Sequence, residues 1–291
     1  MDYRECFDKG KQTLAEAGIE EADLDARLLL EYVCGTDRND LLVHGDREVL
    51  SEQEAVYLSL IGKRAERIPL QYLTGVQDFM GMEFRVDEHV LIPRQDTEIL
   101  VEEALRELRD GMDILDMCTG SGCILISLLR YSNDCTGVGV DISGEALAVA
   151  EGNARRLLAP EKQVRFLESD LFAAVNGIYD MIVSNPPYIP SGDIGSLMPE
   201  VRDHEPVSAL DGREDGLFYY RKIAEECRRF LKPGGMLFCE IGCDQGTTVS
   251  EILSQGGFGE IRVIKDYAGL DRVVSGILRH ASAPPVGECG I

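Results

Sequence analysis

The chain has 291 residues, enough for one large domain or for a large and a small one, and its apolar fraction of 44% suits a protein that buries a full core. Its 52 acidic and 29 basic residues leave a formal net charge of −23, which disfavours a nucleic-acid partner, although a local basic groove would still be compatible with it. The nine cysteines form no C-x-x-C pair and no apolar run approaches the ~20 residues that span a bilayer, so we expect a cytoplasmic protein with reduced thiols, no metal site and no membrane contact.

Residues 1–71 are predicted to form a helical domain without convincing strands. One helix carries its apolar face on Leu24, Leu28, Leu29, Tyr32 and Val33 and ends at Gly35. The segment Ser51-Glu-Gln-Glu54 has a capping-box pattern that predicts the start of a second amphipathic helix, which ends before Pro69. No residue in this region indicates chemistry, so we expect it to dock a partner.

Residues 72–93 are predicted to be a connector. The alternation in Phe79-Met-Gly-Met-Glu-Phe-Arg-Val86 indicates a β-hairpin with Gly81 at the bend. Asp96 or Thr97 is then expected to cap a helix that runs to about Arg109.

Residues 94–280 alternate strand and helix patterns, as a parallel α/β sheet does. The segment 189–216, rich in Gly, Pro and Asp, is a long loop of the kind that forms lids or stays disordered. Residues 281–291 are expected to be a flexible tail. The predicted strands are 112–116, 136–141, 164–167, 179–184, 236–241, about 260–266 and 271–278, and the helices end near 130, 158 and 231.

A glycine-containing turn follows the first predicted strand of this region. Gly120 and Gly122 allow close approach of a ligand, and the following helix offers N–H donors. The dinucleotide fingerprint G-x-G-x-x-G would need glycine where Leu125 stands, which weakens a dehydrogenase interpretation. A tight strand–helix turn without a ligand is the alternative.

Two further strand ends carry polar residues. Asp141, at the end of the second strand, is suited to accept both hydroxyls of a ribose, or simply to cap the next helix. The segment Ser169-Asp-Leu-Phe172 follows the third strand, where an adenine could lie, or where a capped loop could stand alone. Parallel strand ends meet at one edge of the sheet, which is where open α/β folds bind ligands.

The fourth strand ends at Asn185-Pro-Pro-Tyr188. Two consecutive prolines remove two N–H donors, so the backbone there presents mainly carbonyl acceptors. Asn185 adds an amide oxygen and Tyr188 adds a flat ring. This combination is complementary to a planar group that bears an NH₂, either an amide or a nucleobase amino group; an ordinary strand-to-loop turn is the alternative.

These four strand ends together resemble the class I S-adenosylmethionine-dependent methyltransferases. Further segments narrow the resemblance to the protein-glutamine methyltransferases of peptide chain release factors, the PrmC/HemK family. They are Leu73-Thr-Gly75, Val90-Leu-Ile-Pro93-Arg94, Glu205-Pro206, Ala209-Leu-Asp-Gly212, Asp215-Gly-Leu217 and Asp266-Tyr-Ala-Gly-Leu-Asp-Arg272. The resemblance covers nearly the whole chain, to about residue 279.

The resemblance implies a doubly wound, seven-stranded, mostly parallel sheet with a helical N-terminal bundle. It also implies methyl transfer from S-adenosylmethionine to the N5 amide nitrogen of the glutamine in the Gly-Gly-Gln motif of a release factor. Phe79 and Arg94 would wall the site. By position, the methyl donor would lie among Cys118, Thr119, Gly120, Ser121, Gly122, Asp141, Leu171 and Asn185, and the glutamine would be held by Asn185, Pro186, Pro187 and Tyr188.

The chain departs from the family pattern at two places. Cys118 stands where the family usually has glycine, and Gln95-Asp96 stands where Pro-Glu is usual. Neither change removes a group that amide methylation needs. The competing interpretations are a methyltransferase acting on a nucleic-acid base and a non-catalytic module that binds a nucleotide.

Overall fold

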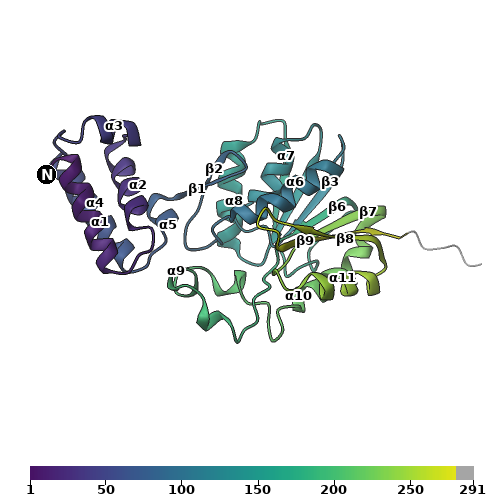
Figure 1. Ribbon diagram of the computed structural model, residues 1–291. Helices are drawn as coiled ribbons and strands as arrows, with labels where there is room; N and C mark the ends of the chain where they lie inside the picture. Colours follow the sequence, from purple (N-terminus) through teal and green to yellow (C-terminus); the bar gives the residue numbers. More distant parts are fainter. Residues whose placement is uncertain (280–291) are drawn as a thin grey trace, which may run out of the picture. The chain divides into compact units, whose positions relative to one another are not determined.

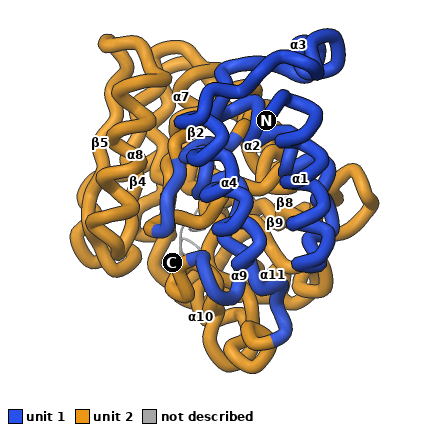
Figure 2. Tube along the Cα trace, turned by 90° about the vertical axis from the view of Figure 1, so that its left-hand side faces the viewer, with its two compact units in different colours: residues 1–77, 86–88, 196–205 blue, residues 78–85, 89–195, 206–291 orange. Residues whose placement is uncertain are grey.

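The computed structural model describes residues 1–279, which form two compact units (Figures 1 and 2). Unit 1 comprises residues 1–77, 86–88 and 196–205, and unit 2 comprises the remaining described residues. Within residues 1–279, no helix is both long and apolar enough to cross a membrane. The tail predicted at 281–291 lies outside the described residues.

Unit 1 is helical, as predicted. Its core contains Cys6, Leu14, Leu29, Tyr57 and Ile61, all at most 2% exposed. Its elements are α1 (Tyr3–Glu16), α2 (Ala22–Cys34), α3 (Arg38–Val43), α4 (Ser51–Ala65), α5 (Leu70–Thr74) and, from a distant part of the chain, α9 (Pro199–Arg202).

The predicted apolar face of α2 is only partly correct. Leu29 is buried, but Leu24 and Tyr32 are exposed. The buried face instead includes Asp25, a charged residue that a hydrophobic pattern cannot place inside a core. Asp25 is tolerated there because an arginine neutralises it.

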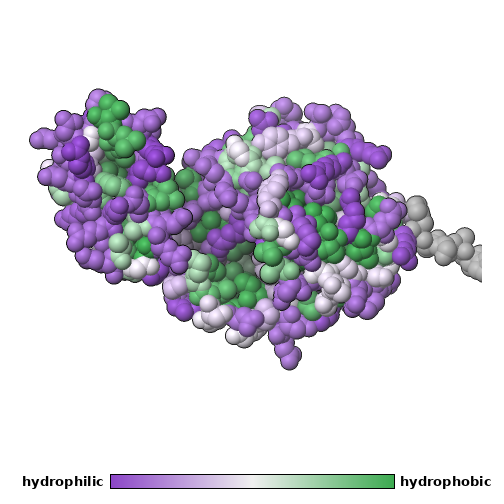
Figure 3. Space-filling model, in the orientation of Figure 1, coloured by the Kyte–Doolittle hydropathy of each residue, from purple (hydrophilic) through white to green (hydrophobic). Residues whose placement is uncertain are grey.

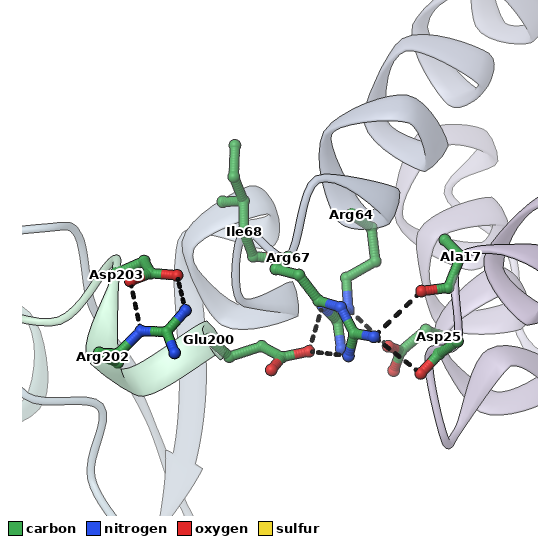
Figure 4. Close-up of polar contacts among 9 residues, drawn as sticks. Ala17, Asp25, Arg64, Arg67, Ile68, Glu200, Arg202 and Asp203 are labelled. Carbon is green, nitrogen blue, oxygen red and sulfur yellow. Dashed lines mark hydrogen bonds and ion pairs between the residues drawn. The ribbon is translucent and has the colours of Figure 1, made fainter. Parts of the chain in front are cut away.

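That arginine, Arg64 of α4, joins three segments of unit 1 (Figure 4). Its Nε donates to Asp25 at 2.7 Å and its Nη1 donates to Glu200 of α9 at 3.0 Å. Arg67 donates to the same Glu200 oxygen at 3.2 Å and to the carbonyls of Ala17 and Gly18 at 3.0 Å each. Since Arg64, Asp25 and Glu200 are each less than 10% exposed, this ion-pair cluster fastens α9 to the N-terminal helices.

The capping box predicted at Ser51 is wrong. The helix begins one residue earlier, so Leu50 is its N-cap and makes no side-chain capping bond. A capping box does occur at α1, where Asp2 and Glu5 exchange side-chain and backbone hydrogen bonds. Serine and glutamate at this spacing occur both at a cap and one residue inside the helix, and the sequence does not distinguish these positions.

The predicted hairpin forms, with β1 (Val76–Phe79) and β2 (Met82–Arg85) around Gly81, whose φ is +67°. Phe79 and Phe84 meet edge to face with ring centroids 6.0 Å apart. Both rings are buried, and they help to cover one face of the sheet of unit 2.

Unit 2 is built on a seven-stranded sheet in the order β5-β4-β3-β6-β7-β9-β8. All neighbouring pairs from β5 to β7 are parallel, and β9 is antiparallel to both β7 and β8. This confirms the predicted doubly wound, mostly parallel sheet. The strands are β3 (Asp113–Met117), β4 (Thr136–Asp141), β5 (Gln163–Glu168), β6 (Tyr179–Ser184), β7 (Leu231–Glu240), β8 (Phe258–Lys265) and β9 (Asp271–Leu278).

Helices cover both faces of this sheet (Figure 1). Successive strand residues alternate between two apolar cores: Met181 packs with α6 and α7, whereas Ile182 packs with α10 and α11. Strands buried on both faces read as continuous apolar runs, as Met181-Ile-Val183 does. The helices are α6 (Glu98–Glu107), α7 (Cys123–Arg130), α8 (Gly144–Leu157), α10 (Phe218–Glu226) and α11 (Gly246–Gln255), with short 3₁₀ turns η1 (Gln95–Thr97), η2 (Ile194–Ser196), η3 (Val207–Ala209) and η4 (Cys227–Arg229).

One predicted helix end and one predicted side-chain cap in unit 2 are wrong. The helix expected to end near residue 231 ends at Glu226 and continues only as the turn η4, because β7 already begins at Leu231. Thr97 precedes α6 as expected, but neither Asp96 nor Thr97 makes a side-chain capping bond. The Thr97 hydroxyl instead accepts from the side-chain amide of Asn185.

Candidate active site

A cleft lies at the carboxyl ends of the parallel strands in unit 2. The strand order reverses at β3, which has β4 on one side and β6 on the other. Chain segments leaving β3, β4, β5 and β6 therefore diverge there, and the space between them is the usual ligand site of an open α/β sheet. The cleft has about 960 Å³ of atom-free space, including its opening to solvent.

The turn after β3 forms one wall of the cleft. Cys118, Thr119, Gly120 and Ser121 all line it. Gly120 has a φ of +54°, and an added Cβ there would meet nothing within 4 Å, so its backbone is open to a ligand. Gly122, also predicted as a ligand contact, does not line the cleft. Its φ is +79°, and a Cβ there would lie 2.9 Å from Ile126, so this glycine serves the packing of α7.

Asp141 ends β4 and also lines the cleft. One carboxylate oxygen accepts the backbone N–H of Gly120 at 2.9 Å, and the other accepts that of Ser143 at 3.1 Å. Burial raises its pKa, and these N–H groups oppose the rise. Each oxygen keeps a second lone pair for a hydroxyl donor. The helix cap is Ser143 and not Asp141, because Ser143 accepts the N–H of Ala146.

The turn after β5 supplies Ser169, Asp170 and Leu171 to the same cleft. Leu171 has a φ of +47°, an unfavourable value for a leucine, which the Ser169 side chain supports by donating to the Leu171 carbonyl at 2.7 Å. The Leu171 side chain therefore offers an apolar surface beside the polar groups of Ser169 and Asp170 at the end of β5.

At the end of β6, Asn185 and Pro187 line the cleft. The Nδ2 group of Asn185 donates to the Thr97 hydroxyl at 3.3 Å. The amide oxygen Oδ1 of Asn185 therefore remains available to accept a hydrogen bond. Four strand ends predicted from the sequence to share a ligand therefore meet around one space.

Two predicted members of this tetrapeptide do not line the cleft. Pro186 is buried, and the Tyr188 side chain packs against the core that includes α10 and α11. Burial raises the pKa of Tyr188 to about 12. The Tyr188 carbonyl accepts from Gln245 at 3.0 Å, and a Cβ on Gly216 would lie 2.4 Å from that carbonyl oxygen. Gly216 of the 189–216 loop and Gln245, the N-cap of α11, therefore pack against the backbone of Tyr188 and hold the tetrapeptide in place.

Phe79 and Arg94 were both predicted to form part of the wall of the site. Arg94 lines the cleft, and Phe79 does not. Phe79 is 1% exposed and belongs to the apolar core. The prediction for Phe79 was wrong because an aromatic residue in a short hairpin suits a core as well as a cleft.

The structure adds residues that sequence reasoning missed. Thr97 lines the cleft, and its hydroxyl accepts from Asn185. Another side of the cleft is formed by residues of the loop 189–216 and the start of α10, namely Pro206, Ser208, Ala209 and Tyr219. The buried Glu240 beside the cleft could have been found, because it ends β7, the strand beside β6 in the sheet.

Two buried carboxyls lie beside this cleft. Burial raises the pKa of Asp116 to about 7, against the opposing hydrogen bond from Thr119 at 2.6 Å. Burial also raises the pKa of Glu240 to about 7, and the positive charge of Arg272 opposes it. Strong shifts of this kind are concentrated at functional sites.

Comparison with known families gives two matches along the chain. Residues 5–75 match the model of the PrmC N-terminal domain, and residues 95–197 match the model of the methyltransferase small domain. The first covers the N-terminal helices, and the second covers strands β3 to β6 with all four strand ends of the cleft.

Similar proteins extend over almost the whole chain. The release factor glutamine methyltransferase of Geobacter sulfurreducens is 43% identical, over 94% of this chain and 95% of that protein. The enzyme of the same name from Caulobacter vibrioides is 40% identical over 94% and 96%. A crystal structure of a methyltransferase from Pyrococcus furiosus is 17% identical, with a TM-score of 0.53, and covers 79% of this chain and all of that one, which shows the shared fold.

Proposed function

Because the chain belongs to the family of release factor glutamine methyltransferases, we propose that its cleft transfers a methyl group from S-adenosylmethionine to a glutamine side-chain amide of a peptide chain release factor. The methylated atom is the amide nitrogen N5, in the Gly-Gly-Gln motif. The observation that carries the proposal is the orientation of Asn185, whose Nδ2 is bonded to Thr97 so that Oδ1 remains to accept an N–H.

The cleft residues fit S-adenosylmethionine. Gly120 has open space at its Cα, Asp141 has lone pairs for ribose hydroxyls, and Leu171 offers an apolar surface to a base. When bound, the sulfonium supplies an electrophilic methyl group, and the tasks left to the protein are positioning and electrostatics.

The substrate amide would be held by two acceptors. Asn185 Oδ1, at the cleft, accepts one N–H. The backbone carbonyl of Pro186 is the second acceptor expected from the sequence; Pro186 is buried outside the cleft lining, so this bond requires the substrate amide to reach past Asn185 and Pro187. An amide nitrogen is a weak nucleophile, because its lone pair is shared with its carbonyl. Two acceptors on its hydrogens fix the amide plane and stabilise the positive charge that develops on nitrogen during transfer. Tyr188 packs against the core and supports the Asn185–Pro187 backbone. The amide nitrogen loses one of its protons after methylation.

The test is Asn185→Ala, assayed with labelled S-adenosylmethionine and purified release factor. Loss of an acceptor aimed at developing charge should lower kcat by about 100-fold, as the loss of one such hydrogen bond does in other enzymes. Asn176→Ala, an exposed asparagine outside the cleft, is the matched control and should keep wild-type turnover. Near-normal kcat in Asn185→Ala with donor still bound would refute the acceptor mechanism.

The same assay separates the competing substrates. Release factor, duplex DNA and transfer RNA are offered in parallel to the full chain with labelled donor. We expect label only in the release factor, because a chain with a net charge of −23 repels a phosphate backbone. Transfer to either nucleic acid would point to a base methyltransferase, and donor binding without any transfer would point to a binding module.

A further inference from the structure

Helix α8 carries one polar side chain on its buried face. Most residues of that face are small and apolar, and they recur at helical spacing: Ala146, Leu147, Ala150, Asn153 and Ala154. Asn153 is completely buried. A side-chain amide costs free energy when it is buried, unless its donors and its acceptor are hydrogen-bonded. The partners of Asn153 therefore indicate which parts of the fold this residue joins.

The amide of Asn153 uses both of its donors and its acceptor. Oδ1 accepts the backbone N–H of Arg85 at 2.8 Å, and Nδ2 donates to the Arg85 carbonyl at 3.0 Å. The second hydrogen of Nδ2 is donated to the carbonyl of Ser121 at 3.0 Å. A carboxylate of the same shape could accept from Arg85 but would have no hydrogen for either carbonyl. This position therefore requires an amide.

The first partner, Arg85, is the last residue of β2 in the two-stranded hairpin. Asn153 bonds to both its N–H and its carbonyl, as a residue of a further antiparallel strand would. These bonds hold the chain a few residues before it becomes a side of the cleft. We call this side, residues 89–94, the connector wall. The residues of the connector wall that line the cleft are His89, Val90, Leu91, Pro93 and Arg94.

The second partner, Ser121, lies in the turn after β3, residues 118–122, which we call the donor turn. Ser121 lines the cleft. Its carbonyl belongs to the same peptide unit as the N–H of Gly122, which donates to the Thr119 carbonyl at 2.9 Å. This peptide unit is therefore held on both sides, by Asn153 and by the donor turn itself. Asn153 thus joins two sides of one cleft, although it does not line the cleft.

We propose that Asn153 is a positioning residue that holds the donor turn and the connector wall at the spacing that S-adenosylmethionine requires. This inference rests on the proposed function, because it concerns the methyl donor of that reaction. Asn153 acts through the backbone of Ser121 and Arg85 and does not touch the donor. Since coupling between two sites is reciprocal, donor binding should in turn stabilise the bonds of Arg85.

The central variants are Asn153→Asp and Asn153→Ala, assayed in the full chain for S-adenosylmethionine affinity by calorimetry and for kcat and KM. Aspartate keeps the shape and the acceptor for Arg85 but has no hydrogen for Ser121. Both variants should weaken donor binding at least about tenfold, as the loss of an orienting partner does at metal sites. At saturating donor, kcat should stay within about threefold, because the bond between Asn185 and Thr97 is untouched.

A matched control separates positioning from a general loss of stability. Tyr179→Phe removes the bond from a buried tyrosine to the Asn176 carbonyl at 2.8 Å. Tyr179 begins β6, whereas the cleft lies at the other end of that strand. This variant should lower Tm and leave donor affinity unchanged. Wild-type donor affinity in Asn153→Asp, or an equal loss of affinity in Tyr179→Phe, would overturn the positioning role.

Hydrogen exchange tests the same role in the wild type, without any substitution. Arg85 does not line the cleft, so a donor bound there does not cover its N–H. Saturating S-adenosylmethionine should nevertheless slow exchange of this N–H at least about threefold relative to the amides of β8, at the far edge of the sheet. In Asn153→Asp this slowing should disappear, because the link to Ser121 is lost. An unchanged exchange rate in the wild type would refute the role even if neither variant folds.

The positioning role and the proposed function fail in different ways. Methyl transfer to release factor by the wild type, together with wild-type donor affinity in Asn153→Asp, would refute the positioning role alone. Donor binding that depends on Asn153, without any transfer to release factor by the wild type, would refute the proposed function alone. A wild type that does not bind S-adenosylmethionine would refute both.

Discussion

Cys118 has a φ of +61°, in the left-handed region that favours glycine, in the turn after β3. The chain therefore tolerates a Cβ where the backbone geometry disfavours one. Burial raises the pKa of the Cys118 thiol well above its usual range, so the group stays neutral at physiological pH. The backbone of Cys118 is strained, but its thiol is not reactive. Because Cys118 lines the cleft, this strained backbone is part of the candidate site.

The comparison of Cys118→Gly with Cys118→Ala measures that strain. Both variants remove the sulfur, but only glycine removes the Cβ. We expect the glycine variant to be more stable than the alanine variant by about 1 kcal/mol, which corresponds to about 2–4 °C in Tm. Thermal unfolding followed by circular dichroism gives the difference, and an alanine variant at least as stable as the glycine variant would show that the turn stores no strain.

At the scale of elements, the short helix α9 illustrates how one segment can belong to a distant part of the fold. It lies between two stretches of loop that belong to unit 2, yet it packs with the N-terminal helices through Glu200. Three residues that follow it, Pro206, Ser208 and Ala209, line the cleft. The segment 196–205 of this loop therefore belongs to unit 1, where the ion pairs of Glu200 hold α9.

Removal of the arginine at the centre of this anchor should be costly. Arg64→Met leaves Asp25 buried without its partner and leaves Glu200 with Arg67 alone, and breaking a buried pair in this way typically costs about 3–5 kcal/mol. The matched control is Arg202→Met on α9, whose pair with Asp203 is exposed to solvent and should contribute little to stability. Urea unfolding gives both values.

Hydrogen exchange supplies a local readout for the same two variants. In Arg64→Met the amides of α9 should exchange faster than in wild type, because the helix loses its anchor. In Arg202→Met they should be nearly unchanged. Equal effects of the two substitutions on stability and exchange would mean that apolar packing, and not the ion-pair cluster, holds α9.

At the scale of the whole molecule, the dominant property is negative charge. The net charge is −23, and the visible surface is largely hydrophilic with only scattered apolar patches (Figure 3). A charge of this size disfavours the compact state through self-repulsion. Many local ion pairs, such as Lys232 with Asp113 and Asp180, offset only part of it.

Salt should therefore stabilise this protein. Raising the concentration of sodium chloride from about 50 to about 500 mM at pH 8 shortens the screening length several-fold and should raise Tm. The increase should shrink as the pH approaches the isoelectric point of about 4.5, where the repulsion disappears. A neutral osmolyte at matched osmolarity is the control, and a Tm that falls with salt at pH 8 would show that attractive ion pairs outweigh the repulsion.

The doubly wound arrangement was implied by the family resemblance. The residue patterns by themselves determined a parallel α/β sheet, the order of its strands along the chain and the four strand ends that meet at the cleft. These follow from local signals: apolar runs predict buried strands, glycines mark turns, and parallel strand ends must share an edge. The Asn-Pro-Pro-Tyr segment indicated its chemistry in the same way, because proline limits its own backbone.

Only the tertiary structure decided which side chains of those segments reach the cleft. It placed Asn185 at the cleft and Tyr188 behind it, moved Phe79 into the core, and joined Asn185 to Thr97. The reason is physical: a strand or turn pattern fixes the path of the backbone, whereas hydrogen bonds between residues far apart in the chain depend on packing that no local pattern contains.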